Sequence, residues 1–245
     1  MITSKYIITV LFTVLWFTAL PTYGEVVQPH RGLNSGYEAA IRSRVPEEYA
    51  PQERRITEPA PAKGRFLVAT PRLKGSVFEQ SVILLIDYSL NGATGLIINK
   101  PSSATATDVF PDIKELAEYK ENIYLAGPVQ IGHIYLLIRS GNKPLESVEI
   151  LQNLYFSASI NTLKESAHRK EEGLKLRMYF GYSGWSPGQL VREILGGSWY
   201  VMEGEEDVVF SEKPSLIWQK LIRKRSPFYD TVLRESDDDI TVAGL

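Results

Sequence analysis

The segment that sets the architecture of this chain is Gly181-Tyr182-Ser183-Gly184-Trp185-Ser186-Pro187-Gly188-Gln189-Leu190. An apolar, strand-like run precedes it at 174–180, and an amphipathic run follows it at 190–195. Glycine serves where φ is positive or where the backbone must approach another group closely. We therefore interpret the segment as a strand-to-helix junction in a fold that mixes strands and helices.

The end of this segment has the residues of a helix start. Ser186 is predicted as the N-cap, Pro187 as the first helical residue and Gln189 as the third, which completes an S-x-x-Q capping box. The first N–H groups of such a helix can bind an anion or a carbonyl group, or they can be capped by Ser186 and solvent. We favour the capped turn.

The same segment contains G-x-S-x-G, the nucleophile-elbow pattern of α/β-hydrolases, with Ser186 at its centre. That fold needs a histidine after the serine in the chain, but all three histidines precede it: His30, His133 and His168. Pro187 also lacks the N–H that would form half of an oxyanion hole. We therefore rank a Ser186 hydrolase last among the candidate functions and predict no catalytic residue.

The composition is that of an ordinary globular protein. The 245 residues are 44% hydrophobic and 23% charged, with a formal net charge of −2, which suits one substantial domain or two small ones. A near-neutral charge argues against a strongly electrostatic nucleic-acid binder. The chain has no cysteine, which excludes disulfides, cysteine nucleophiles, iron–sulfur clusters, thiolate zinc sites and a lipoprotein anchor.

The amino-terminal residues 1–24 are predicted to be a signal peptide. Lys5 provides a positive start, residues 6–20 are uncharged and apolar, and small residues precede a cleavage site before Glu25. The apolar run is short for a membrane span; an uncleaved membrane anchor through residues 6–20 is the alternative. We expect a periplasmic or secreted protein with no stable membrane span after cleavage.

Three further regions follow the signal. Residues 25–63 are rich in proline and charge and are predicted to be a flexible leader. Residues 64–224 carry the apolar runs and are predicted to form one domain. Residues 225–245, which include Asp237-Asp238-Asp239, are predicted to be an acidic disordered tail.

Within the domain, short aliphatic runs predict strands and amphipathic runs predict helices. Strands are expected at 66–69, 82–86, 95–99, 123–125, 134–138, 148–156, 174–180 and 199–202, and helices at 108–118, 159–169, from 186 and at 214–223. Asn91-Gly92 predicts a hairpin turn between the second and third strands. The last helix is expected to place four apolar residues inward, namely Leu216, Ile217, Trp218 and Leu221. Because strict strand–helix alternation is missing, an α+β fold is favoured over a doubly wound parallel sheet.

Four blocks carry a resemblance to a known family. They are Phe66-Leu67-Val68-Ala69-Thr70-Pro71, Gly95-Leu96-Ile97-Ile98-Asn99-Lys100-Pro101, Gly127-Pro128-Val129 and the segment 181–190. Together they resemble the bacterial AlgH/YqgE-like family over about residues 64–224. The resemblance implies a single α+β domain in which a bifurcated, mostly antiparallel sheet is folded into a pseudo-barrel and flanked by helices.

The resemblance implies less about function. Family members have been labelled transcriptional regulators, and no established catalytic activity comes with the family. The chain departs from the family pattern at Ser183 and Ser186, where alanine or glycine is usual, and at Val191, where an acidic residue is frequent. The predicted export signal is a larger departure, because typical relatives look cytoplasmic.

The candidate ligand site combines glycine-rich turns with a lysine at a strand end. Its residues are Asn99, Lys100, Gly127, Pro128, Tyr182, Trp185 and Gln189. We expect the cleft between these turns to hold an unknown protein, a peptide or a small anionic ligand. The alternative is that Asn99 hydrogen-bonds a turn and that Lys100 is solvated. No phosphate-loop motif occurs in the sequence, and neither His133 nor His168 has a second ligand at tight spacing, so we expect no cofactor and no metal.

Three functions remain open. The first, which we favour, is a non-enzymatic binding or regulatory module that acts outside the cytoplasm. The second is a transcriptional regulator, which follows from the family label; export disfavours a nucleic-acid partner. The third is the Ser186 hydrolase.

Overall fold

The computed structural model describes residues 58–225, except 118, 120 and 170. The predicted signal peptide, leader residues 25–57 and tail residues 226–245 lie outside the described residues. No helix of the described part is long and apolar enough to cross a membrane.

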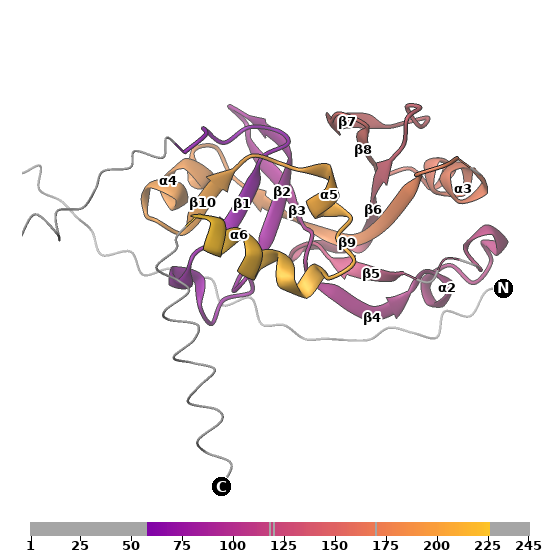
Figure 1. The fold of residues 1–245 in the computed structure, drawn as a ribbon, viewed down its shortest axis with the longest axis horizontal. Coiled ribbons are helices and arrows are strands. Elements are labelled where there is room, and N and C mark those ends of the chain that lie inside the picture. Colours follow the sequence, from indigo (N-terminus) through magenta and orange to yellow (C-terminus); the bar gives the residue numbers. More distant parts are fainter. Residues whose placement is uncertain (1–57, 118, 120, 170, 226–245) are drawn as a thin grey trace, which may run out of the picture. The chain divides into compact units, whose positions relative to one another are not determined.

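The described body is built from ten strands and several short helices (Figure 1). The strands are β1 (Phe66–Ala69), β2 (Val82–Ser89), β3 (Gly92–Ile97), β4 (Pro101–Thr105), β5 (Asn122–Leu125), β6 (Val129–Arg139), β7 (Val148–Leu151), β8 (Leu154–Ser157), β9 (Lys175–Trp185) and β10 (Trp199–Met202). The α-helices are α2 (Ala106–Val109), α3 (Ile160–His168), α4 (Gln189–Leu195), α5 (Glu206–Val209) and α6 (Ile217–Arg225). The 3₁₀ turns are η2 (Pro71–Leu73), η3 (Lys114–Leu116) and η4 (Pro214–Leu216).

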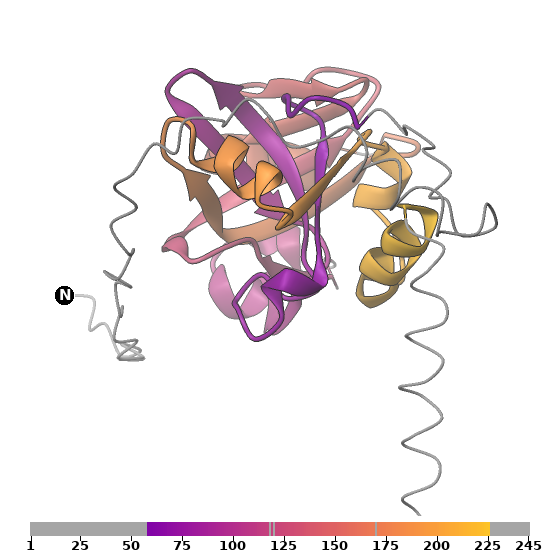
Figure 2. The same ribbon diagram turned by 90° about the vertical axis from the view of Figure 1, so that its left-hand side faces the viewer.

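The strands form one sheet that forks at β9. Its main path runs β10-β1-β2-β3-β9-β6-β8-β7, while β5 also pairs with β9 and carries β4 as a branch. Among the described strands, β5 and β9 pair in parallel and the other pairs are antiparallel. Figure 2 shows the strands curving around a common interior, with α6 packed on one side. The predicted fold class is therefore confirmed: a bifurcated, mostly antiparallel sheet that curls without closing, in a single α+β domain.

Glycines at the fork allow two backbones to approach closely. Along one side of β9, the neighbour changes from β5 to β3 after Phe180. At Gly181 φ is +64°, and an added Cβ would lie 2.7 Å from the carbonyl oxygens of Gly127 and Val129. At Gly127 φ is +151°, and an added Cβ would lie 2.3 Å from the carbonyl carbon of Tyr182. Any larger residue would push these strands apart, so glycine is required at both positions.

Apolar residues fill both faces of the sheet. In one cluster, which we call the inner core, β1, β2, β3, β10 and α6 pack together, and Trp218 of α6 donates its indole N–H to the carbonyl oxygen of Ala69 (2.8 Å). In a second cluster, which we call the outer core, α3 and η3 cover β6 and β9 through residues such as Leu163 and Met178. The aliphatic run 82–86 of β2 is buried throughout, as its lack of alternation predicts.

Several sequence-based boundaries are wrong at the central segment. The glycine-rich stretch is not a turn, because β9 continues through it to Trp185. Helix α4 then starts at Gln189 with Gly188 as N-cap. Ser186 lies two residues before the N-cap position and therefore does not cap the helix. The Gln189 side chain does reach back to the N–H of Ser186 (3.0 Å), which is half of the predicted capping box. The Ser186 carbonyl accepts from the Gln189 N–H (3.0 Å) and closes a tight turn instead.

Other elements also differ from the prediction. The expected helix 108–118 is a single turn, α2, capped by Thr105, because Pro111 cannot continue it and restricts the residue before it. The run 148–156 is two strands, separated by a turn in which Asn153 has φ of +61°. Leu216 belongs to η4 and is 48% exposed, whereas Ile217 and Leu221 are buried as expected. Strand β4 and helix α5 were not predicted, since their sequences are short and polar.

Candidate functional site

Asn99 is a buried residue that fastens a loop to the sheet. Its side-chain oxygen accepts from the Val82 N–H (2.8 Å), and its side-chain nitrogen donates to the carbonyl oxygen of Gln80 (2.9 Å). The residue is 7% exposed. Its amide thus satisfies two backbone groups at the start of β2, which is the turn-bonding alternative considered for it.

Lys100 also points towards that loop. Its Nζ donates to the carbonyl oxygen of Val77 (2.8 Å). Burial lowers the pKa of Lys100 below its ordinary value, and the Glu79 carboxylate opposes that shift. The Lys100 backbone lies beside β5, since its carbonyl accepts from the Leu125 N–H (2.9 Å).

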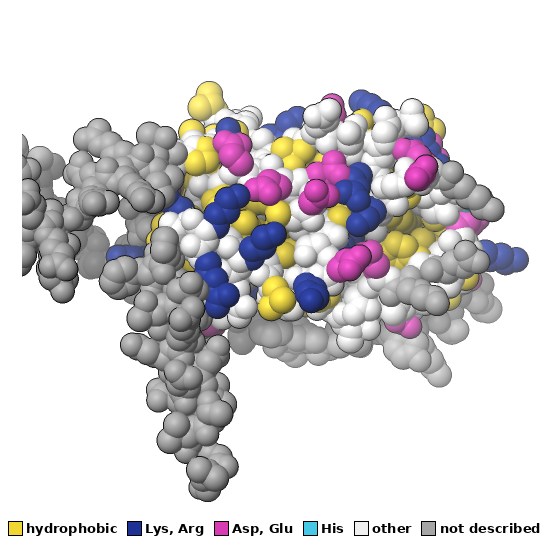
Figure 3. All heavy atoms as spheres, viewed as in Figure 1, with side chains coloured by type: hydrophobic (Ala, Val, Ile, Leu, Met, Phe, Trp, Pro, Cys, Tyr) yellow, Lys and Arg dark blue, Asp and Glu magenta, His cyan; other side chains and the backbone are white. Residues whose placement is uncertain are grey.

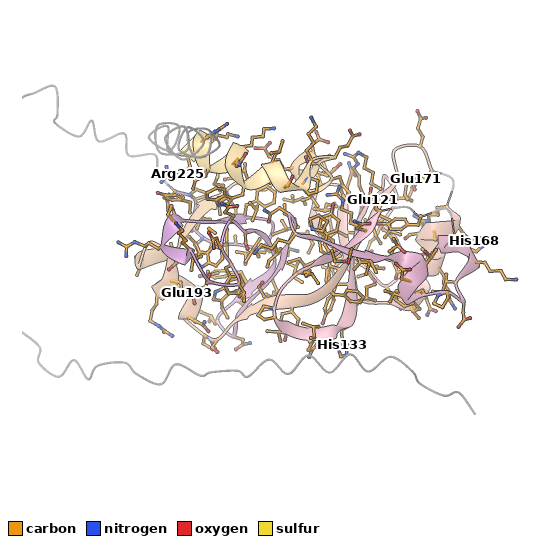
Figure 4. All side chains as sticks on the ribbon, turned by 90° about the horizontal axis from the view of Figure 1, so that it is seen from below. Glu121, His133, His168, Glu171, Glu193 and Arg225 are labelled. Atoms are coloured by element: carbon orange, nitrogen blue, oxygen red, sulfur yellow. The ribbon has the colours of Figure 1, made fainter. Side chains whose placement is uncertain are left out.

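Trp185 and Gln189 converge on a residue that was not predicted, Glu193, which is labelled in Figure 4. One carboxylate oxygen accepts from the indole N–H groups of Trp185 (2.9 Å) and Trp199 (2.8 Å), and the other accepts from the Gln189 amide (3.0 Å). The two indole rings meet edge to face at 6.1 Å. The sequence contains a signal for the contact between Gln189 and Glu193, because the two residues are four apart on one helix and therefore share a face.

The predicted site residues are thus brought together through their backbones more than through their side chains. Ala126 lies in the fork, where its carbonyl accepts from the Ile97 N–H (3.0 Å) and the Ser183 hydroxyl (3.0 Å). The turn at Gly127 and exposed Pro128 follows directly. The side chains diverge from the fork. Those of Asn99 and Lys100 bind residues 77–82, whereas those of Trp185 and Gln189 bind Glu193.

Tyr182 lines a cavity of about 470 Å³, which we call the aromatic mouth. Its lining comes from six strands and consists of Ile86, Asp87, Thr94, Gln130, Tyr135, Val148, Ile150, Phe156 and Tyr182. Tyr135 and Phe156 are stacked (5.7 Å between ring centroids, 21° between planes), and Tyr182 stands edge to face with Tyr135 (6.0 Å, 88°). The three rings form two walls of a corner.

The left-handed backbone at Gly181 places Tyr182 in this corner. In a regular strand, residues two apart share a face. Phe180 packs against the outer core, but Tyr182 packs against the inner core, so the alternation is broken between them. Sequence periodicity alone would have placed both rings on one face.

The hydroxyl of Tyr135 is held within the mouth. It donates to the side-chain oxygen of Gln130 (3.0 Å), a residue with φ of +49°. Burial, and to a smaller extent Tyr182, raises the pKa of Tyr135 above its ordinary value. The ring is therefore a neutral phenol at physiological pH and is available as a hydrogen-bonding and stacking group.

A second cavity, of about 830 Å³, lies between β5, β9, α3 and η3 and is lined by charges of both signs. Its central base, Arg177, is 4% exposed and already engaged: Nε donates to Glu121 (3.0 Å), and the terminal nitrogens donate to the carbonyls of Val209 and Ser211. The guanidinium also lies over the ring of Tyr124 (4.8 Å). Arg177 thus ties the α5 region to the sheet.

The residues considered for metal and hydrolase chemistry are dispersed. Within the described part of the chain, no group of three or more histidine or acidic side chains is placed to hold a metal. Figure 4 shows His133 at the lower edge of the body and His168 at its right-hand side, well apart in this view. Ser186 is exposed, on the turn before α4. On the face shown in Figure 3, basic and acidic side chains are interspersed.

A family model described as AlgH-like matches residues 66–229. The chain belongs to this AlgH-like family. UPF0301 proteins of known sequence are similar to it: one from Chlamydia pneumoniae is 34% identical over 161 residues, which cover 66% of this chain and 85% of that protein. Another, from Methylococcus capsulatus, is 32% identical over 167 residues and covers 67% and 91%.

Two solved structures have the same fold. The AlgH protein from Pseudomonas aeruginosa superposes with a TM-score of 0.58 at 28% identity, covering 69% of this chain and 90% of that one. A protein from Corynebacterium diphtheriae superposes with a TM-score of 0.59 at 23% identity, covering 68% and 88%. All the candidate site residues and the whole aromatic mouth lie within the AlgH-like match. The biochemical role of the family is not defined, so the function must be argued from the site.

Proposed function

We propose that this protein is a non-enzymatic binding module that acts outside the cytoplasm and recognises an extended segment of a partner protein at the aromatic mouth. The observation that carries the proposal is the group of three aromatic rings that lines this cavity. The mouths of barrel-like sheets are frequent ligand sites, and a cavity of about 470 Å³ lies within the usual size range for them.

A peptide suits this lining better than the small anion considered from the sequence. Tyrosine and phenylalanine offer a large contact area and lose little conformational entropy on binding. Val148, at the rim, is 55% exposed and extends the apolar surface along β7. Among the described residues the lining has no lysine, arginine or histidine to attract an anion.

The proposal of a binding rather than a catalytic role rests on how the charged side chains are used. Glu193 is held by two indoles and an amide, and Arg177 is held by Glu121 and two carbonyls. A catalytic acid or base needs a reacting atom within its reach. These groups instead fasten one element of the fold to another.

Action outside the cytoplasm rests on the sequence of residues 1–24. The test is fractionation of cells followed by mass spectrometry of the amino-terminal peptide. A mature protein that starts at Glu25 in the exported fraction is the expected result. An intact Met1 in the cytosol would contradict it and favour the transcriptional regulator, and an intact Met1 in membranes would indicate a tethered domain.

Binding at the mouth is tested with the exported protein and a displayed library of random peptides. We expect selected peptides to lose at least tenfold in affinity to the Tyr182→Ala variant, because the ring forms one wall of the mouth. Tyr200→Ala, which removes a half-buried tyrosine from β10, is the matched control and should bind normally. Equal loss in both variants, or selection of no peptide, would refute the site.

A further inference from the structure

We infer that the group recognised in the aromatic mouth is the side chain of a lysine or an arginine in the bound segment. This inference rests on the proposed function and specifies its ligand. It follows from three properties of the lining: the arrangement of the rings, the single acid beside them, and the hydrogen-bonding character of the polar groups.

The rings are arranged as two adjacent walls of a cation-binding cage. A cation is attracted to the face of an aromatic ring when it lies within about 6 Å of the ring centre. Tyr135 and Phe156 are stacked with nearly parallel planes, and Tyr182 meets Tyr135 at 88°. A side chain that enters the corner therefore meets ring surface on two sides, while its aliphatic stem contacts Ile86 and Ile150 of the lining.

A bulge in β2 directs the acid to the same cavity. The pairing of β2 with β3 shifts register between Leu85 and Asp87, so one extra residue is inserted there. As a result, the consecutive residues Ile86 and Asp87 both line the mouth, although neighbours in a regular strand point to opposite faces. Asp87 is the one acid among the described lining residues, and it is exposed.

The polar groups of the lining suit a ligand that only donates hydrogen bonds. An ammonium or guanidinium group has donors and no acceptor. The Asp87 carboxylate only accepts, and the hydroxyls of Thr94, Tyr135 and Tyr182 can each accept as well. Lys63 lies on the segment beside β7. Its Nζ donates to the carbonyl oxygen of Glu149 (2.9 Å), so its ammonium group is hydrogen-bonded to the edge of that strand.

The test compares four blocked pentapeptides that differ at the central residue of a glycine background: lysine, arginine, norleucine or glutamate. Their dissociation constants are measured with the whole exported protein, by nuclear magnetic resonance of isotope-labelled tyrosine rings at low salt. We expect the lysine and arginine peptides to bind about 5–30-fold more tightly than the norleucine peptide, which is the range that cation–π contacts supply. The glutamate peptide should bind most weakly.

Variants separate the charge from the rings. Asp87→Asn, which removes the carboxylate charge at equal side-chain volume, and Tyr182→Leu, which replaces the ring face by a smaller apolar group, should each bring the lysine-to-norleucine affinity ratio towards one. Tyr182→Phe keeps the ring and should preserve the ratio. Asp112→Asn, which neutralises an exposed acid outside the mouth, is the control and should leave the ratio unchanged.

The outcomes distinguish this inference from the proposed function. If all four peptides shift the mouth tyrosines with equal affinity, peptide binding stands and the preference for a cation is refuted. If none of them shifts these rings at millimolar concentration, the peptide-binding function itself is refuted. If the ratio survives in Asp87→Asn and Tyr182→Leu, the basic side chain binds elsewhere and the inference is wrong.

Discussion

Replacing Glu193 by leucine tests whether its carboxylate holds the two buried indoles in place. Trp185 and Trp199 are 6% and 1% exposed, and both donate to the same carboxylate oxygen. Each buried donor left without an acceptor costs about 1–3 kcal/mol, so Glu193→Leu should destabilise the fold by about 2–5 kcal/mol. For a chain of this size that corresponds to a fall in melting temperature of about 5–15 °C.

The measurement is thermal and urea unfolding followed by tryptophan fluorescence and circular dichroism. Glu193→Gln keeps one acceptor oxygen and should lose about 1–2 kcal/mol. Arg192→Leu places the same leucine at an exposed position of the same helix and should change stability by less than about 0.5 kcal/mol. If Glu193→Leu melts within about 1 °C of the unaltered protein, the carboxylate does not anchor the indoles and our account of Trp185 fails.

Two further predictions concern the fork and a helix cap. Gly127→Ala should cost about 2–5 kcal/mol by urea unfolding, because the new Cβ would lie 2.3 Å from the β9 backbone at a positive φ; Gly132→Ala, which meets nothing within 4 Å, should be neutral or slightly stabilising. Hydrogen bonds from Thr105 lower the pKa of Asp108 below its ordinary value, so the stability that the ionised carboxylate adds is complete above about pH 4 and is lost as pH falls through the lowered pKa. Asp108→Asn should therefore flatten the dependence of stability on pH between about pH 5 and pH 2, and an unchanged acid limb would contradict the capping box.

Local sequence signals were sufficient to predict elements that are held by contacts between residues close together in the chain. The β2–β3 hairpin follows from an aliphatic run and the Asn91-Gly92 turn, and α3 begins after Ser159 because its hydroxyl accepts from the first N–H groups of the helix. Both features are specified by residues only a few positions apart. The sequence therefore predicted both, with nearly correct bounds for α3, while β2 and β3 extend three residues further towards the turn than predicted.

The central segment was misjudged because its conformation depends on partners far away in the chain. Gly181 and Gly184 look like turn residues, yet β9 continues through both, because Gly184 pairs with Thr94 of β3 and the residues on either side of Gly181 pair with β6. The aromatic mouth could not be predicted from the sequence for the same reason. Tyr182 was identified, but Tyr135 and Phe156 reach it through pairings that no local pattern contains.

The fork at β9 also constrains the order in which the chain can fold. Strand β9 pairs with β3, β5 and β6, so these earlier strands have unsatisfied edges until residue 185 is available. Strand β1, the first of the body, keeps one unpaired edge for longer still, because that edge is covered by β10, the last strand. Pairings of such long range slow folding and leave strand edges open to other chains in the meantime. A chain truncated before Trp199 would lack the strand that covers β1, and it should aggregate rather than form a smaller domain.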